Sequence, residues 1–245
     1  FANMAGGLNP EELIIWLYEG GGAQLASEYR REVFGVESIP CGIFPTEIFL
    51  HSKKRIQTLA DFQGLKMRTA GAWAEIAGNL GASTVILPGS EVYPALERGV
   101  IDATEWSSPS VNLPSGFHKI AKYIIMPGVH QPGAVQECPI NLDAWNRISK
   151  GDQELVKLAG RLMVMESWIR YAYHDIDALA KMRAHGNEFV KLDAAFIKAA
   201  HKAAAEWSDA QAAASPWFKR ALDNRRKFQK ALRENWNFFR FPIGM

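Results

Sequence analysis

The chain has 245 residues, of which 48% are hydrophobic and 22% are charged, a composition typical of globular proteins. Its formal net charge of +2, without a dense block of Lys and Arg, argues against nucleic acid as a partner. No apolar run reaches the roughly 18 residues that a membrane-spanning helix requires. The length allows one large domain or two modest ones, with a core that needs no additional cross-links.

The first part of the chain carries two helix signals followed by short apolar runs. In the first helix, Asn9 is suited to the N-cap and Pro10 to the first helical position. Three glycines at 20–22 interrupt the helical pattern, and we interpret them as a helix break rather than as a phosphate-binding loop. The elements predicted in chain order are helices at 9–18 and 23–35, strands at 36–44 and 47–53, and a helical turn at 58–62.

The stretch from 64 to 106 reads as strand, helix, strand, helix, strand. The predicted strands are 64–71, 83–88 and 100–106, and the predicted helices are 72–82 and 90–99. We expect Ser90 to cap the second helix. This order indicates βαβ units and therefore a parallel sheet, in which ligands bind beyond the carboxyl ends of the strands.

The last third of the chain is predicted to be helical. A helix over about 151–184 would be about 50 Å long, more than one small lobe, so it is suited to bracing two lobes. An Ala-rich helix follows at 193–214, and a further helix starts at Ser215 and Pro216. The further helix carries an apolar stripe, which either packs within the chain or contacts a partner helix. The stripe consists of Phe218, Leu222, Phe228, Leu232 and Trp236.

Common motifs of enzymes and metal sites are missing from the sequence. The six histidines form no HExxH or HxxxH pattern, and there is no GxSxG motif. Cys41 and Cys138 do not have the spacing of a zinc site. They can pair or be buried singly; we expect the second, because unpaired cysteines are among the most buried residues.

Three residues at strand ends are candidates for binding. Arg68 offers a planar fork of donors suited to a carboxylate, and the helix after it would add backbone N–H groups. The alternative is a surface arginine or one paired with a nearby acid. Taken singly, Glu105 is better explained as an exposed acid at a strand end and Trp106 as part of the core packing than as binding residues.

Several motifs, in this order and spacing, resemble the extracytoplasmic solute-binding proteins of tripartite ATP-independent periplasmic (TRAP) transporters. The motifs are TLADFQGLKMRTAG, LGASTVILPGSEVYPALERGVIDATEW, KYIIMPGVHQPG and NLDAW. They are most similar to the branch that binds α-keto acids and related small monocarboxylates. The resemblance implies a two-lobe α/β fold of the periplasmic-binding-protein type, with hinge strands and a long lobe-bracing helix. It places lobe one at 1–42 and 138–245, including the C-terminal helices, and lobe two at 43–137. In that family more of lobe one precedes this point, so we expect lobe one to be incomplete at the N-terminus.

The resemblance also implies roles for individual residues. Arg68 matches the arginine that pairs with the substrate carboxylate. Glu105 matches a metal-binding carboxylate, and Trp106 matches the residue whose backbone carbonyl reaches the metal. Gln131 falls where the branch places a further metal or ligand contact, and Glu47 stands where members commonly carry a Gln that touches both metal and substrate.

The Glu at position 47 bears on the identity of the metal. Two carboxylates, Glu47 and Glu105, together with a substrate carboxylate would leave excess buried negative charge around Na⁺. Ca²⁺ accepts mixed carboxylate and carbonyl ligands, so we expect Ca²⁺ to be favoured over Na⁺. Alternatively, Glu47 is protonated, or it meets a donor group of a different substrate without a metal.

The expected function is capture of a small 2-oxo or 2-hydroxy monocarboxylate by closure of the lobes, without catalysis, in the periplasm. The expected partners are the membrane permease and a second copy bound through the C-terminal helices, which resemble helices that some members exchange. Rival interpretations are a ligand sensor with the same pocket, a metal-dependent α/β enzyme, and a structural module without a ligand. The sequence does not identify the substrate; Tyr18 and Trp73 are further candidates for the cleft.

Overall fold

A six-stranded mixed sheet and a two-stranded ladder organise the fold of the computed structural model, which describes residues 5–239. Side chains are described as far as Trp236. The strands are β1 (Val36–Phe44), β2 (Leu50–Ser52), β3 (Lys66–Arg68), β4 (Ser83–Val85), β5 (Ala103–Thr104), β6 (Tyr123–Met126), β7 (Ala134–Asn141) and β8 (Glu188–Lys191). The helices are α1 (Pro10–Tyr18), α2 (Gly22–Phe34), α3 (Leu59–Phe62), α4 (Ala72–Asn79), α5 (Gly89–Glu97), α6 (Pro109–Ser115), α7 (Phe117–Ile120), α8 (Leu142–Arg147), α9 (Lys150–Ala184), α10 (Ala194–Ala214) and α11 (Pro216–Phe239).

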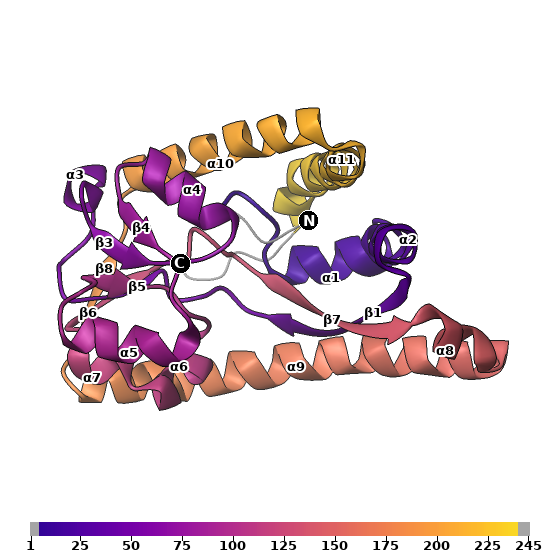
Figure 1. Cartoon of the computed structure of the whole chain (residues 1–245), viewed down its shortest axis with the longest axis horizontal. Coiled ribbons are helices and arrows are strands. Elements are labelled where there is room, and N and C mark those ends of the chain that lie inside the picture. The colour runs from indigo at the N-terminus through magenta and orange to yellow at the C-terminus, as the bar shows by residue number, and fades with distance from the viewer. Residues whose placement is uncertain (1–4, 240–245) are drawn as a thin grey trace.

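The six-stranded sheet has the order β4-β3-β5-β2-β6-β8 and forms one half of the molecule (Figure 1). Strands β4, β3 and β5 are parallel, as the βαβ pattern predicts, whereas β2 pairs antiparallel with both β5 and β6. Buried side chains of α4 and α10 form one core with the sheet, around Phe49, Phe62 and Phe196. Buried side chains of α5 and α7 form a second, smaller core.

The other half of the molecule is built from helices. Leu13 and Trp16 of α1 pack with Ile43 of β1 and Val164 of α9. The capping box of α1 confirms the predicted role of Asn9, whose side chain accepts from the backbone N–H of the third helical residue. The two halves are joined by the antiparallel pair β1 and β7, and α9 runs beneath both (Figure 1).

A disulfide joins the two connecting strands. Cys41 of β1 is bonded to Cys138 of β7, so our expectation that the two cysteines are buried singly is wrong. Strand pairing explains the difference: β1 and β7 pair antiparallel with Ile39 opposite Cys138, and Cys41 lies at the bulge between Pro40 and Gly42, so two positions 97 residues apart in sequence come within bonding distance. Disulfides persist in oxidising compartments such as the periplasm.

Most predicted elements are confirmed, with corrections at helix ends. The helix expected at 90–99 begins at Gly89 with Pro88 at the N-cap, so Ser90 is not its cap. Strands β6, β7 and β8 were not predicted; β8 pairs in parallel with β6 inside the six-stranded sheet. That pairing places Glu188–Lys191 in a sheet whose other strands all come from residues 43–137. The division into lobes at 42 and 138 stays a prediction.

The apolar stripe of α11 is covered within the chain. Leu222 is buried, Phe228 packs on the core around Trp16, and Phe218 lies edge-on to Trp207 of α10. The intramolecular alternative for this stripe is therefore the one that the structure shows. Among the described residues, no helix is both long and apolar enough to span a membrane.

Candidate functional site

The register of the sheet brings Arg68 and Glu105 together. Strands β3 and β5 are parallel neighbours with Arg68 opposite Thr104, so the chain leaves both strands at the same edge. The Glu105 backbone N–H donates to the Arg68 carbonyl over 3.4 Å. The Arg68 guanidinium in turn donates to Glu105 Oε1 over 3.1 Å, with both side chains largely shielded from water.

Glu47 reaches the same place from a loop between β1 and β2. Its Oε1 accepts from Gln131 Nε2 over 2.5 Å, and its Oε2 lies 3.0 Å from His130 Nε2. A backbone bond from Glu47 N–H to the Gln131 carbonyl, 3.3 Å long, ties the two loops together. A Cβ at Gly128 would lie 2.2 Å from the Glu47 carbonyl oxygen, so this close approach of the loops requires a glycine.

A cavity of about 390 Å³ connects these groups. Its lining residues are Glu47, Arg68, Thr69, Ala70, Gly71, Ala72, Trp73, Glu105, Trp106, His130 and Gln131. The structure thus brings all five residues that the sequence predicted into one cavity, and Trp73 with them. Tyr18 does not line it; that residue lies at a different cavity beside α2 and α9.

The cavity is also bordered by the start of a helix. Gly71 has φ +62°, a left-handed conformation that suits glycine, and it directly precedes α4. Ala72 and Trp73, the first residues of α4, line the cavity, so the positive end of that helix adjoins the space. Trp106 lies on another side, with its ring centroid 5.3 Å from the Arg68 guanidinium carbon. The predicted helix start beside Arg68 is confirmed.

Three potential metal ligands converge in the cavity. Glu47, Glu105 and His130 each offer one ligand atom, and these atoms lie within 4.8 Å of one another. All three residues are buried, between 4% and 8% exposed. Sequence reasoning missed His130 because it searched for paired-histidine motifs, although the residue stands next to the predicted Gln131 in VHQPG.

Burial disfavours the charged form of Glu105, the acid that follows β5. Desolvation raises the pKa of the Glu105 carboxyl, and the charge of Glu47 raises it further, whereas His130 and Arg68 lower it. An additional cation beside the two carboxylates would relieve this repulsion. Carboxylate and amide oxygens suit hard cations such as Ca²⁺, and an imidazole nitrogen is common at divalent transition metals. The donor set therefore fits a cation.

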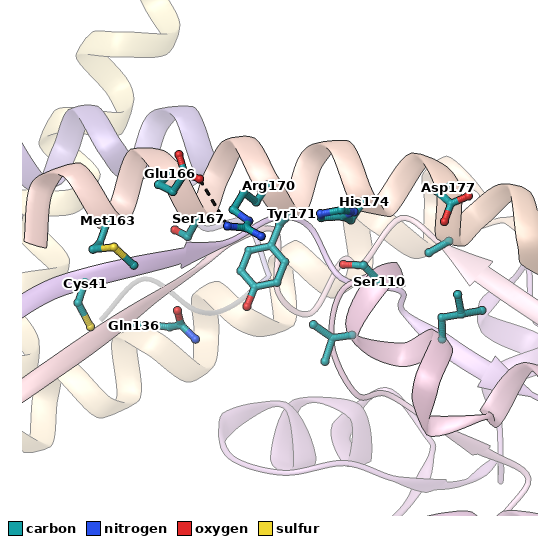
Figure 2. Close-up of a pocket in the computed structure, with 13 residues that line it drawn as sticks. Cys41, Ser110, Gln136, Met163, Glu166, Ser167, Arg170, Tyr171, His174 and Asp177 are labelled. Atoms are coloured by element: carbon teal, nitrogen blue, oxygen red, sulfur yellow. Dashed lines mark ion pairs between the residues drawn. The ribbon is translucent and has the colours of Figure 1, made fainter.

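A larger cavity of about 630 Å³ lies along α9 and has a different character (Figure 2). Ser167 and Tyr171 of α9 face it together with Gln136 of β7 and Ser110 of α6 (Figure 2). Its charged groups are solvated, since the Glu166 side chain is 56% exposed and the Arg170 side chain 68%. None of the predicted site residues lines it, so its volume alone does not make it the functional site.

Comparisons with known proteins identify the family and the fold of the chain. Residues 19–214 match the family model of the bacterial extracellular solute-binding proteins, family 7. The monocarboxylate 2-oxoacid-binding periplasmic protein of Nostoc sp. is 33% identical over 227 residues, which are 92% of this chain and 62% of that protein. The chain therefore spans less than two thirds of this relative.

Two solved structures have the same fold. The TRAP periplasmic solute-binding protein of Colwellia psychrerythraea, with bound calcium and pyruvate, has a TM-score of 0.88 at 29% identity and covers 96% of this chain and 72% of its own. The one of Pseudoalteromonas atlantica, with bound sodium and pyruvate, has a TM-score of 0.87 at 28% identity and covers 97% and 72%. Their two-lobe fold is the fold of this chain. The chain belongs to family 7 of the bacterial extracellular solute-binding proteins (DctP), the extracytoplasmic TRAP proteins that its sequence resembles.

Proposed function

We propose that this chain captures a small 2-oxo monocarboxylate, of which pyruvate is the simplest, together with a metal ion, and delivers it to a membrane permease. The observation that carries the proposal is the convergence of one guanidinium and two carboxylates, Arg68, Glu47 and Glu105, on one cavity of about 390 Å³. The presence of pyruvate and a cation in two similar structures supports the same ligand class.

Each group has a distinct task in this proposal. Arg68 receives the ligand carboxylate, because its fork can donate two parallel hydrogen bonds to the two oxygens. Glu105, Glu47 and Gln131 would hold the cation, with the Trp106 carbonyl as a further oxygen ligand and His130 beside them. The cation would supply positive charge for the 2-oxo oxygen. The two lobes then close around the ligand, and no covalent bond is formed or broken.

The cation is proposed to be Ca²⁺ rather than Na⁺. Similar structures hold either ion, so the fold alone allows both. The buried carboxylates of Glu47 and Glu105 are close enough to bind the same ion. They favour a divalent over a monovalent cation, because each desolvated negative charge needs compensation. The side-chain amide of Gln131 is neutral and donates a hydrogen bond to the Glu47 carboxylate, so it contributes no charge to the site.

Calorimetric titration tests ligand binding. Pyruvate is titrated into the chain in sodium-free buffer, with Ca²⁺ or Na⁺ added separately, and propionate serves as the analogue that lacks the 2-oxo oxygen. We expect pyruvate to bind in the presence of a cation and propionate to bind at least tenfold more weakly. Arg68→Lys should weaken pyruvate binding by roughly 10- to 100-fold, since the bidentate fork is lost. The control Arg55→Lys changes an exposed arginine outside the cavity and should bind as the unmodified chain does. Absence of binding heat for every 2-oxo acid with both cations would refute the proposal.

A second titration tests the cation. Glu47→Gln removes one negative charge with little change of shape, so it should shift the cation preference toward Na⁺. Glu97→Gln is the matched control, because Glu97 is exposed and lies outside the cavity. An unchanged ratio of Ca²⁺ to Na⁺ affinity in Glu47→Gln would contradict the preference for Ca²⁺. Conversion of pyruvate during either titration would contradict the proposal of binding without catalysis.

A further inference from the structure

Two of the described residues that line the cavity of about 390 Å³ carry large apolar side chains, and they lie beside different charged groups. Trp106 lies beside the guanidinium, with its ring centroid 5.3 Å from the Arg68 guanidinium carbon. Trp73 lies beside His130, with 6.0 Å between the two ring centroids, and His130 in turn contacts Glu47. The two rings therefore border different parts of the cavity, Trp106 the part next to the guanidinium and Trp73 the part next to the acids.

Trp73 is held in place by the core of the six-stranded half. It is the second residue of α4 and is 5% exposed. Its ring lies edge-on to Phe49, with 5.8 Å between the centroids, and it belongs to the same buried cluster as Phe49 and Phe62. Close-packed neighbours leave a side chain little freedom to move aside. Trp73 therefore forms a fixed part of the cavity wall.

The indole N–H of Trp73 is buried and has no hydrogen-bond partner among the described residues. By contrast, the indole N–H groups of Trp16, Trp207 and Trp217 each donate to an acceptor side chain. A buried donor without a partner is destabilising, and phenylalanine would fill a core position without that cost. Packing alone therefore does not explain a tryptophan at position 73.

The shape of a 2-oxo acid directs its tail toward the uncharged part of the cavity. Its carboxylate and its 2-oxo oxygen lie on adjacent carbons and would face the guanidinium and the cation, so the tail extends away from both. The uncharged lining residues at 69–72 have small side chains or none, so they leave space, and the large ring of Trp73 follows them. At about 390 Å³ the cavity is at the lower end of the sizes common for ligand sites, so one bulky ring in its wall matters for what fits.

We propose that Trp73 is a specificity-determining residue whose ring limits the length of the ligand. The ring leaves room for the tail of the shortest 2-oxo acids and excludes longer tails. This inference rests on the proposed function, because it concerns the tail of the same ligand. A difference of one methylene in a packed pocket commonly changes binding by roughly 10- to 200-fold, so a fixed wall is sufficient to separate acids that differ only in length.

Calorimetric titration with 2-oxo acids of increasing length tests this role. Pyruvate, 2-oxobutanoate and 2-oxohexanoate are titrated into the unmodified chain and into Trp73→Ala, with Ca²⁺ and Na⁺ both present. The unmodified chain should bind 2-oxohexanoate at least about tenfold more weakly than pyruvate. Trp73→Ala should bind 2-oxohexanoate at least about tenfold more tightly than the unmodified chain does, whereas pyruvate loses contacts with the ring and should bind more weakly.

Two further variants separate the size of the ring from the stability of α4. Ile76 lies on the same helix, is 1% exposed and belongs to the same core, but it does not line the cavity. Ile76→Ala therefore loosens the helix without widening the cavity, and it should keep the length preference of the unmodified chain. Trp73→Phe keeps an aromatic ring in the core and removes the unpaired N–H, so it should fold even if Trp73→Ala does not. Its smaller ring should raise the affinity for 2-oxobutanoate relative to pyruvate by roughly threefold or more.

The outcomes distinguish this role from the proposed function. The same length preference in the unmodified chain and in both Trp73 variants would overturn the role of Trp73, and so would an equal gain for 2-oxohexanoate in Ile76→Ala. An unmodified chain that binds 2-oxohexanoate as tightly as pyruvate would overturn it as well. In each of these cases the unmodified chain still binds pyruvate, whereas failure of the proposed function means that it binds none of the three acids.

Discussion

Replacement of Arg68 by alanine separates the folding role of the ion pair from its binding role. Arg68 and Glu105 are 3.1 Å apart, with side chains only 13% and 10% exposed. At that distance and an effective dielectric constant of about 20, their Coulomb attraction is about 5 kcal/mol. Removing one partner of a buried pair commonly costs 3–5 kcal/mol, because the other charge stays buried.

The loss in Arg68→Ala should lie near the lower end of that range. Glu105 can escape the buried charge by binding a proton, and burial already raises the pKa of its carboxyl. We expect the free energy of unfolding at pH 7 to fall by about 3 kcal/mol, roughly a 150-fold change in the folding equilibrium. The variant Arg68→Ala/Glu105→Gln has no buried charge at this pair and should recover most of that loss.

Urea unfolding followed by circular dichroism measures these differences, and calorimetry measures pyruvate binding in the same samples. The double variant should be stable and yet fail to bind pyruvate. If it is no more stable than Arg68→Ala, the buried charge of Glu105 is not the cause of the loss. If Arg68→Ala itself unfolds as the unmodified chain does, the pair contributes nothing to folding, and the electrostatic reasoning is wrong.

Two further predictions concern the fold around the site. Burial and, secondarily, the charge of His118 lower the pKa of His51 to about 3, from about 6.5 when unfolded. Between those values only the unfolded chain binds the proton, so stability should fall by about 1.4 kcal/mol per pH unit as the pH drops below 6.5. His51→Gln should remove about one proton from that slope in urea titrations at pH 4–7; an unaltered slope would refute the assignment. A Cβ at Gly160 would lie 2.6 Å from the Pro40 carbonyl oxygen, so Gly160→Ala should cost about 1–3 kcal/mol, whereas Gly151→Ala in the same helix should not destabilise. Equal melting temperatures of the two alanine variants would contradict this packing.

The local elements of this fold follow from short-range signals in the sequence. The βαβ order of 64–106 and the capping box of α1 were predictable because the residues that decide them lie within a few positions of each other. The disulfide and the pairing of β8 with β6 were not, since both depend on how distant segments meet. The elements missed by the sequence were the short helices α6, α7 and α8 and the strands β6, β7 and β8, whose partners are remote in sequence.

In the candidate site, too, some residues could be placed from local sequence signals and others could not. Arg68 and Glu105 could be placed together because they end neighbouring strands of one predicted sheet. Glu47 and Gln131 lie in loops, and only the resemblance to a family indicated that they belong with Arg68. No periodicity or motif marked His130, whose position depends on the close approach of two loops at Gly128.

The hydrogen-bond partners of Glu105 and Glu47 lead us to expect that the anion and the cation bind cooperatively. In this structure Arg68 donates to Glu105, while His130 and Gln131 contact Glu47. A ligand carboxylate that takes the Arg68 fork weakens the contact with Glu105, whose charge is then buried with less compensation. A cation beside Glu105 supplies that compensation, so anion and cation should bind cooperatively, and each should raise the affinity of the other by the same factor. We expect a coupling of at least tenfold between pyruvate and Ca²⁺, measured as the pyruvate affinity with and without the ion. Equal affinities would mean that the two charges of the site act independently.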